Sequence, residues 1–122
     1  MKAVPFRWSE IESDHPIALL HRKSIHGEKS LVARVTLEPG CHVAPHHHDS
    51  EQIAIVLSGK VVWSLGDPGG GEVEKLEMSG GEVLHLPSRV WHGVDALELT
   101  EIIDILSPPG PMGVDRQRDG AH

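Results

Sequence analysis

The chain has 122 residues, a formal net charge of -7 and a single cysteine, Cys41. This length fits one domain with a sizeable core, the acidic balance argues against nucleic acid as a partner, and an intrachain disulfide is excluded. No apolar run approaches the roughly 18 residues of a membrane span, and residues 1–14 show no signal-peptide core. We therefore expect a cytoplasmic protein without a membrane partner.

Short β-strands divided by turn residues are predicted along the chain. Residues 31–38 alternate apolar and polar side chains, which is typical of a strand with unlike faces, and 18–25 are expected to pair with them through a turn at 26–29. A capping-box pattern at Ser9–Glu12 is the one helix signal. Further strands are predicted at 52–58, 60–65, 73–78, 82–87 and 96–107, with a loop of turn formers at 66–72. Many short strands with frequent turns indicate an all-β sandwich or barrel.

Histidine is the unusual residue of this composition: ten are present, with no tyrosine, and three of them are adjacent. Residues two apart on an extended chain point the same way, so His46 and His48 share a face that His47 does not. Gln52 stays in phase with them, whereas Glu51 is out of phase unless a bulge intervenes. The spacing therefore favours Gln52 over Glu51 as a partner of the two histidines.

A second segment offers another imidazole. His92 follows a predicted strand that ends at Pro87. His85 lies within that strand among leucines and is expected to pack or to support a ligand. A transition metal takes three or four ligands from imidazole, carboxylate or carbonyl oxygen. His92 can therefore complete a metal site with the first segment.

The two segments resemble the two sequence motifs of the cupin family. The first motif is matched in order by Gly40, His46, His48, Gln52 and Gly59. The second is matched by Gly81, Pro87 and His92. In the first motif a glutamate usually stands where this chain has Gln52, and in the second Arg89 and Ala96 replace a glycine and an asparagine. The match extends over roughly residues 20–109.

The resemblance implies an all-β double-stranded β-helix, or jelly-roll barrel, that forms a homodimer. It also implies one divalent transition metal (Zn, Ni, Fe or Mn) near the barrel mouth. The ligands would be His46, His48, Gln52 and His92. The chain then divides into an N-terminal arm at 1–19, a cupin barrel at 20–109 and a tail at 110–122. The tail is rich in Pro, Gly and charge and is expected either to wrap over a neighbour or to be disordered.

A glutamine ligand would change the charge of the site. Three imidazoles and one amide are all neutral, so a divalent ion would keep its full charge, where a glutamate would reduce it. In a pocket of low dielectric this favours a substrate that brings a negative charge. It also makes the ion a stronger Lewis acid. We therefore expect an anionic small-molecule substrate.

The glutamine variant, together with the segment ALELTEIIDILSPPG, resembles one cupin subgroup. Some of its members open unsaturated uronates from pectin and alginate breakdown into linear keto sugars. The subgroup carries an aspartate, an aromatic two residues later and an arginine four beyond that. The matching positions here are Asp104, Leu106 and Gly110. The arginine that would clamp a substrate carboxylate is therefore absent, and Arg34 or Arg89 are candidates to replace it.

Asp104 is the candidate catalytic residue. If Ile103 and Ile105 pack against the second sheet, Asp104 opens to the barrel mouth, where a carboxylate near a metal ligand can move a proton. The alternatives are an outward, solvated carboxylate or one that orients a histidine.

Further pocket candidates are Arg34, Trp91 and Leu106. Trp91 precedes His92 and is a candidate for substrate contact. Trp63 is expected in the core, and Cys41 is expected to be a small buried residue.

Three functions are compatible with these residues. The first, which Gln52 and Asp104 favour, is a Lewis-acid enzyme that isomerises, tautomerises or eliminates from a small sugar-acid-like carboxylate. The second is a metal-dependent dioxygenase, because redox metals on three histidines can bind oxygen. The third is a non-catalytic cupin that binds a sugar or another small molecule. Metal identity and oxygen consumption separate the first two.

Overall fold

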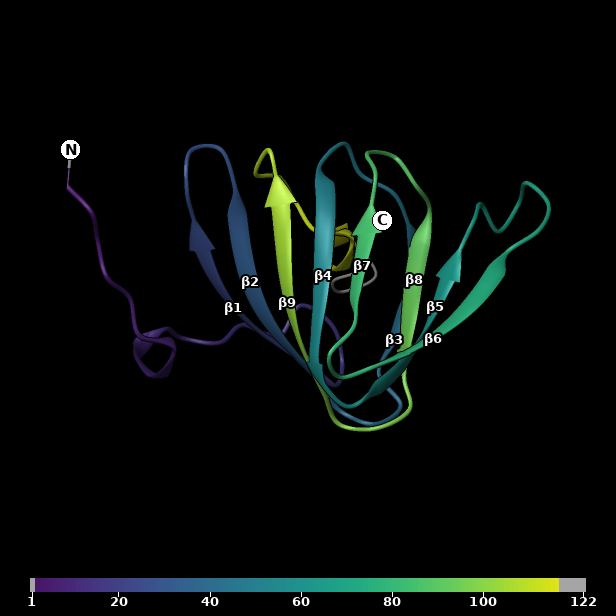
Figure 1. Cartoon of the computed structure of the whole chain (residues 1–122), viewed down its shortest axis with the longest axis horizontal. Coiled ribbons are helices and arrows are strands. Elements are labelled where there is room, and N and C mark those ends of the chain that lie inside the picture. Colours follow the sequence, from purple (N-terminus) through teal and green to yellow (C-terminus); the bar gives the residue numbers. More distant parts are fainter. Residues whose placement is uncertain (1, 117–122) are drawn as a thin grey trace.

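Two antiparallel β-sheets face each other in the computed structural model, which describes residues 2–116 (Figure 1). The five-stranded sheet has the order β1 (Leu20–His26), β2 (Leu31–Leu37), β9 (Thr100–Ser107), β4 (Glu51–Ser58) and β7 (Val83–Leu86). The four-stranded sheet has the order β3 (His42–His46), β8 (His92–Ala96), β5 (Lys60–Leu65) and β6 (Glu74–Ser79). Short 3-10 helices lie at η1 (Trp8–Glu10) and η2 (Gly113–Arg116). The predicted all-β jelly-roll architecture is confirmed.

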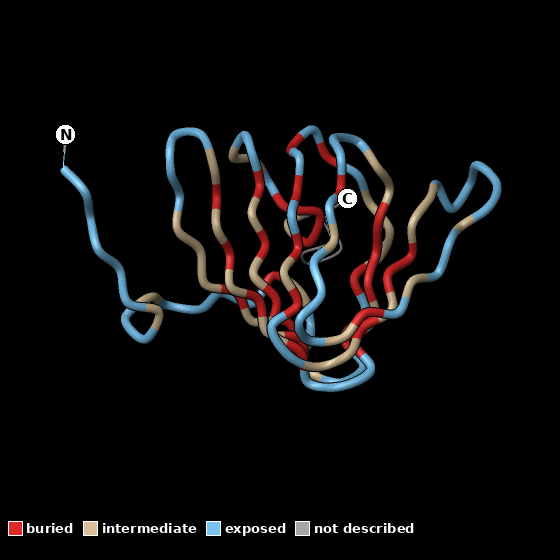
Figure 2. Tube along the Cα trace, viewed as in Figure 1, coloured by how far each residue is buried: buried red, intermediate tan, exposed pale blue. Residues whose placement is uncertain are grey.

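The core lies between the two sheets because their strands alternate inward and outward side chains. In β2 the buried positions are Leu31, Ala33, Val35 and Leu37. Neighbouring β9 buries Thr100, Ile102, Asp104 and Leu106. Figure 2 shows buried positions alternating with partly exposed ones along these strands. The two patterns are in register, since Ala33 lies opposite Asp104 and Val35 opposite Ile102. One carboxylate is thereby placed among mostly apolar side chains on the inner face.

Two strands were not predicted, and both carry site residues. Strands β3 and β8 have five residues each and contain Pro45, Gly93 and Asp95, so neither shows an apolar alternation. They pair with each other, with His46 opposite His92. The strand predicted at 96–107 is in fact the end of β8 followed by β9. Tertiary pairing, and not local pattern, defines this part of the second sheet.

The chain ends differ in their relation to the barrel. The N-terminal arm extends away from it beside β1, whereas η2 lies among the strands (Figure 1). Met112 and Val114 are buried in the hydrophobic core, and η2 contacts β3. The boundaries proposed at 19 and 109 stay predictions, and residues 117–122 of the expected tail lie outside the described part. Within residues 2–116 no helix has the length and apolar character of a membrane span.

Cys41 is a buried core residue, as predicted. Its side chain is 1% exposed. Burial raises the pKa of its thiol to about 11, with further contributions from Asp95 and Glu38. The thiol therefore stays protonated near neutral pH and is poorly reactive.

Gly59 joins β4 to β5 in a conformation that only glycine suits. Its φ is +94°, and an added Cβ would collide with Leu99 O and Thr100. Gly81 has a similar φ of +96°, but a Cβ there would meet nothing within 4 Å. We expect Gly81→Ala to lower the free energy of unfolding by about 1–2 kcal/mol, because alanine is strained at this φ. Gly59→Ala should lower it by the same amount and by about 1–3 kcal/mol more, because the added Cβ overpacks the site.

Urea unfolding of the two variants measures the difference directly. Equal losses at the two positions would contradict the assigned close contact between Gly59 and Thr100.

Candidate metal centre

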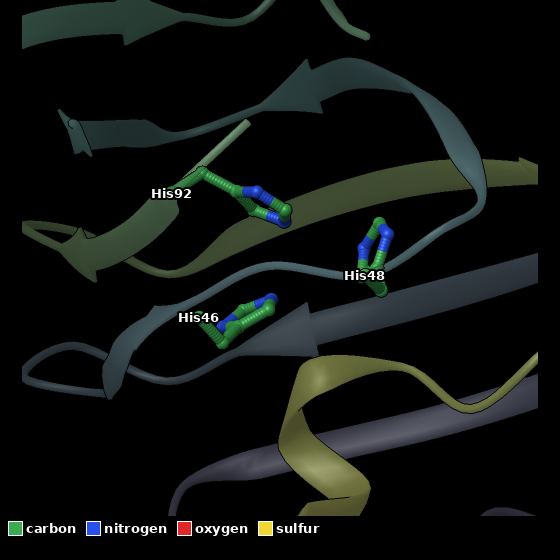
Figure 3. A group of neighbouring side chains, drawn as sticks. All are labelled: His46, His48 and His92. Atoms are coloured by element: carbon green, nitrogen blue, oxygen red, sulfur yellow. The ribbon is translucent and has the colours of Figure 1, made fainter. Parts of the chain in front are cut away.

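Three histidines from two chain segments meet inside the barrel. His46 is the last residue of β3, His48 follows in the adjoining loop, and His92 opens β8 opposite His46. One ring nitrogen from each lies within 4.8 Å of the others. Figure 3 shows the three rings directed toward a common point. The sequence-predicted set of imidazoles is thus assembled at one place.

Backbone carbonyls hold each imidazole in one tautomer. Nδ1 of His46 lies 2.9 Å from Ala44 O, and Nδ1 of His48 lies 2.9 Å from Ser50 O. Nδ1 of His92 lies 2.8 Å from the carbonyl oxygen of residue 90. A carbonyl oxygen only accepts, so each Nδ1 carries the hydrogen and donates it. A neutral ring with its hydrogen on Nδ1 presents an Nε2 lone pair, the form in which histidine binds metals.

The Nε2 atom of His92 is a buried acceptor that faces no hydrogen-bond donor in the described part of the chain. Burial lowers the pKa of His92 to about 3, and the neighbouring His46 and His48 lower it further, against the effect of the Val90 carbonyl. His92 is therefore neutral at physiological pH. A buried acceptor without a donor is costly unless a cation or another donor meets it.

Gln52 adds an oxygen to this group, as the spacing predicted. Its side chain is buried, and Nε2 donates to Asp104 Oδ1 at 2.8 Å. That bond turns Oε1 toward His48 Nε2, 3.0 Å away. In a neutral His48 with its hydrogen on Nδ1, both facing atoms are acceptors, and a shared cation would reconcile them. An imidazole nitrogen and an amide oxygen that lie this close together could both bind one divalent ion.

The residues present therefore suit a divalent transition metal. Three imidazole nitrogens and one amide oxygen form an uncharged set of the kind that such ions accept. Glu51, the alternative to Gln52, is exposed on the outer face and pairs with His85 at 2.6 Å.

Asp104 stands behind Gln52 on the same inner face. Its neighbours across the sheet are Ala33 and Ala54, both fully buried and small enough to leave room beside the carboxyl group. Burial raises the pKa of Asp104 to about 7, while the hydrogen bond from Gln52 lowers it. The expectation that Ile103 and Ile105 would face the second sheet is wrong. They lie on the outer face, and Asp104 itself points inward.

The expected substrate-binding arginines lie elsewhere. Arg34 projects from the outer face of β2 because the buried positions of that strand alternate with it, and its Nε donates to Glu101 at 3.1 Å. Arg89 pairs with Asp49 at 3.0 Å, and both side chains are highly exposed. Neither arginine lines the cavity beside the histidines.

Three other sequence expectations also differ from the structure. Leu106 is fully buried in the hydrophobic core, opposite Gln52 in the sheet. Trp91 packs against the exposed His47 with ring centroids 4.6 Å apart. His85 is exposed, because alternation turns it outward between two inward-facing leucines, so it does not pack in the core. Trp63 is buried as expected and lines the cavity.

Arg22 is a cavity residue that the sequence did not reveal. It lies on the inner side of β1, is 8% exposed, and lines the cavity together with Gln52, Asp104 and the cluster histidines His46 and His92. Burial disfavours its charge, but the hydrogen bonds and charges of its carboxylate partners outweigh this and keep its pKa above the ordinary value. Residues 20–26 show no clear apolar alternation, so nothing local indicated that Arg22 faces inward.

The fold and the cluster define a jelly-roll protein with a histidine-lined metal site inside the barrel. A family profile described as the cupin domain matches residues 33–105, which is more than half of the chain. The chain belongs to the cupin family.

Solved structures agree with this assignment. KdgF from Halomonas sp. is similar with a TM-score of 0.79 and 26% identity over 89% of this chain and 96% of its own. An RmlC-like cupin from Shewanella frigidimarina has a TM-score of 0.74 and 19% identity over 89% and 93%. Oxalate decarboxylase from Bacillus subtilis has a TM-score of 0.74 and 17% identity over 84% of this chain, which spans only 29% of that protein. None of the curated proteins compared with this chain matches it.

The geometry predicts one divalent ion for each chain. We expect His92→Ala to lower the affinity for Zn²⁺ by at least about a hundredfold, because it removes a buried lone pair that faces the ion. His47→Ala is the matched control, since this neighbouring imidazole points outward and should leave the affinity unchanged. Zinc titration by calorimetry of protein prepared without a polyhistidine tag measures both. Equal affinities in the two variants would contradict the site.

Proposed function

We propose that the protein is a metal-dependent enzyme that isomerises or tautomerises a small, sugar-acid-like carboxylate, with Asp104 moving the proton. The observation that carries this proposal is the chain of contacts from His48 through the Gln52 amide to the buried Asp104. It joins a neutral metal-binding set to a carboxyl group within the same cavity. The likeness to KdgF over nearly the whole of both chains supports it, as does the resemblance to cupins that open unsaturated uronates.

The charge of the site supports an anionic substrate. A bound divalent ion would polarise a carbonyl or hydroxyl oxygen of the substrate and attract its negative charge. His46, His48, His92 and Gln52 supply no negative charge to offset it. The low dielectric of the buried cavity strengthens that attraction. Arg22 lines the same cavity but is paired with Asp14 and Asp115, so it adds no net positive charge while those pairs are intact.

Asp104 is suited to hold or release a proton. Gln52 fixes one carboxyl oxygen, Oδ1, by donating to it, which leaves the other oxygen to exchange a proton with the substrate. Ala33 and Ala54 on either side add no competing polar side chain. Water is largely kept out, because the carboxyl group is buried. The identity of the ion, whether zinc, nickel, iron or manganese, stays a prediction. The homodimeric state and the cytoplasmic location of the protein also stay predictions.

Replacement of the Asp104 carboxyl group by an amide should stop the reaction without loss of the bound ion. We expect Asp104→Asn to lower kcat on an unsaturated uronate by about a hundredfold or more, as is usual for a lost general acid or base, with one zinc still bound. Asp95→Asn, on an exposed aspartate, is the control. Proton NMR follows loss of the substrate double bond. Full turnover by Asp104→Asn, or oxygen consumption during turnover, would contradict the proposed chemistry.

The uncharged amide should set the preference for anions. We expect Gln52→Glu to weaken binding of malonate to the zinc-loaded protein by about tenfold or more, which corresponds to about 1.4 kcal/mol. The cause is the added negative charge beside the ion. Glu51→Gln changes one charge on the outer face and should have little effect. Malonate binding that is unchanged or tighter in Gln52→Glu would count against the role of the amide.

A further inference from the structure

We propose that Arg22 is the anion-binding residue of the metal cavity, and that the Asp115 carboxylate occupies it until a substrate carboxylate takes its place. This inference deepens the proposed function and rests on it. In the cupin subgroup that this chain resembles, an arginine at the position of Gly110 would bind the substrate carboxylate. We assign that role to Arg22 in this chain. It also assigns a role to the C-terminal segment 112–115, which covers the site.

Arg22 already binds two carboxylates in the geometry that a substrate would need. Its Nε and Nη2 donate to the two oxygens of Asp14 at 2.9 and 2.7 Å. Its Nη1 and Nη2 donate to the two oxygens of Asp115 at 3.1 and 2.8 Å. Both pairs are bidentate, the arrangement by which a guanidinium recognises carboxylates. The three side chains together carry one net negative charge.

Arg22 lies on the wall between the metal cavity and an open cleft. The metal cavity has a volume of about 40 Å³, enough for a few water molecules and far below the roughly 300–1,000 Å³ of ligand sites. The open cleft has about 720 Å³ and contains Asp14 and Asp115. Arg22 and Met112 line both spaces. The metal cavity alone is too small for a sugar acid, and we expect the segment around Met112 to move aside and join the two spaces.

The segment that must move is held by the buried side chains of Met112 and Val114 and by the hydrogen bonds of Asp115. Gly113 lies so close to the His46 ring that an added Cβ would collide with it. Asp115 accepts from Met112 N–H at 2.9 Å and from Arg22, which ties the segment to β1. The side chain of Asp115 is 31% exposed, so water can solvate it on release.

Exchange of one carboxylate for another keeps the buried cation paired. An Arg22 without partners inside the barrel would carry a large desolvation cost. An incoming carboxylate takes over the bonds that Asp115 gives up, while Asp14 stays in place. A neutral sugar cannot make this exchange, because it offers no charge to replace that of Asp115. The site should therefore select for the carboxylate and not for the sugar ring.

Calorimetry with two sugars that differ only in the carboxylate tests this exchange. The zinc-loaded full chain is titrated with D-galacturonate and with D-galactose, in the wild type and in Asp115→Asn, which keeps an oxygen for the Met112 N–H. We expect Asp115→Asn to bind galacturonate about tenfold more tightly, because one competing carboxylate is gone, with binding of galactose unchanged. Asp67→Asn is the matched control, because Asp67 is exposed in the loop between β5 and β6 and its amide would keep an oxygen for the Gly69 N–H; its binding of galacturonate should stay within about twofold of the wild type.

Loss of the guanidinium should remove the preference for galacturonate. We expect Arg22→Gln, with folding verified by circular dichroism, to bind the two sugars equally weakly while it retains zinc. If Arg22→Gln does not fold, Asp115→Asn alone decides. Equal tightening in Asp67→Asn and Asp115→Asn, no tightening in Asp115→Asn, or no binding of galacturonate to either the wild type or Asp115→Asn would overturn the proposal.

Hydrogen exchange gives a second readout that needs no turnover. Galacturonate should increase amide exchange in the peptide that contains residues 112–115 of the wild type, and galactose should not. Protection or no change with galacturonate would contradict displacement of the segment. These measurements separate the two proposals: full turnover by Asp104→Asn would end the proposed chemistry alone, whereas an Asp115→Asn variant with wild-type binding would end only the exchange at Arg22.

Discussion

The close approach of two hydrogen-bond acceptors, Gln52 Oε1 and His48 Nε2, is the constraint on which the account of the site depends. The two atoms lie 3.0 Å apart inside the barrel. Neither can turn away, because Asp104 holds the amide from one side and the Ser50 carbonyl holds the imidazole from the other. Such a pair repels unless a positive group lies beside both atoms. The fold therefore positions these residues for a cation.

The surrounding fold makes this constraint rigid. The inner face of β9 carries Asp104 between two alanines, so the carboxyl group sits at a fixed depth and its bond to Gln52 is shielded from water. Antiparallel pairing of β3 and β8 sets His46 opposite His92 across the second sheet. The two sheets each contribute part of the site, and the core between them keeps the parts at contact distance. Buried networks of this kind are strong only when every member is satisfied.

Much of this arrangement could be predicted from the sequence, and the predictions that were wrong or missing have identifiable physical reasons. The spacing selected His46, His48 and Gln52 over Glu51. The chain is not one extended strand there, however, because His46 ends β3, His48 lies in the following loop and Gln52 belongs to β4 of the other sheet. Strands β3 and β8 escaped prediction because pairing between distant segments, and not apolar content, defines them. Asp104 was selected as a site residue, but the inner face of its strand was assigned to Ile103 and Ile105, which look more like core residues than a carboxylate does. Arg22 was missed because its burial depends on Asp115, 93 residues away.

The most direct test of the central claim is a crystal structure of the zinc-loaded chain with anomalous diffraction recorded at the zinc absorption edge. The account predicts one anomalous peak within bonding distance of Nε2 of His46, His48 and His92 and of Oε1 of Gln52. A peak bonded to fewer than three of these imidazoles, or a Gln52 amide turned away from the ion, would contradict it.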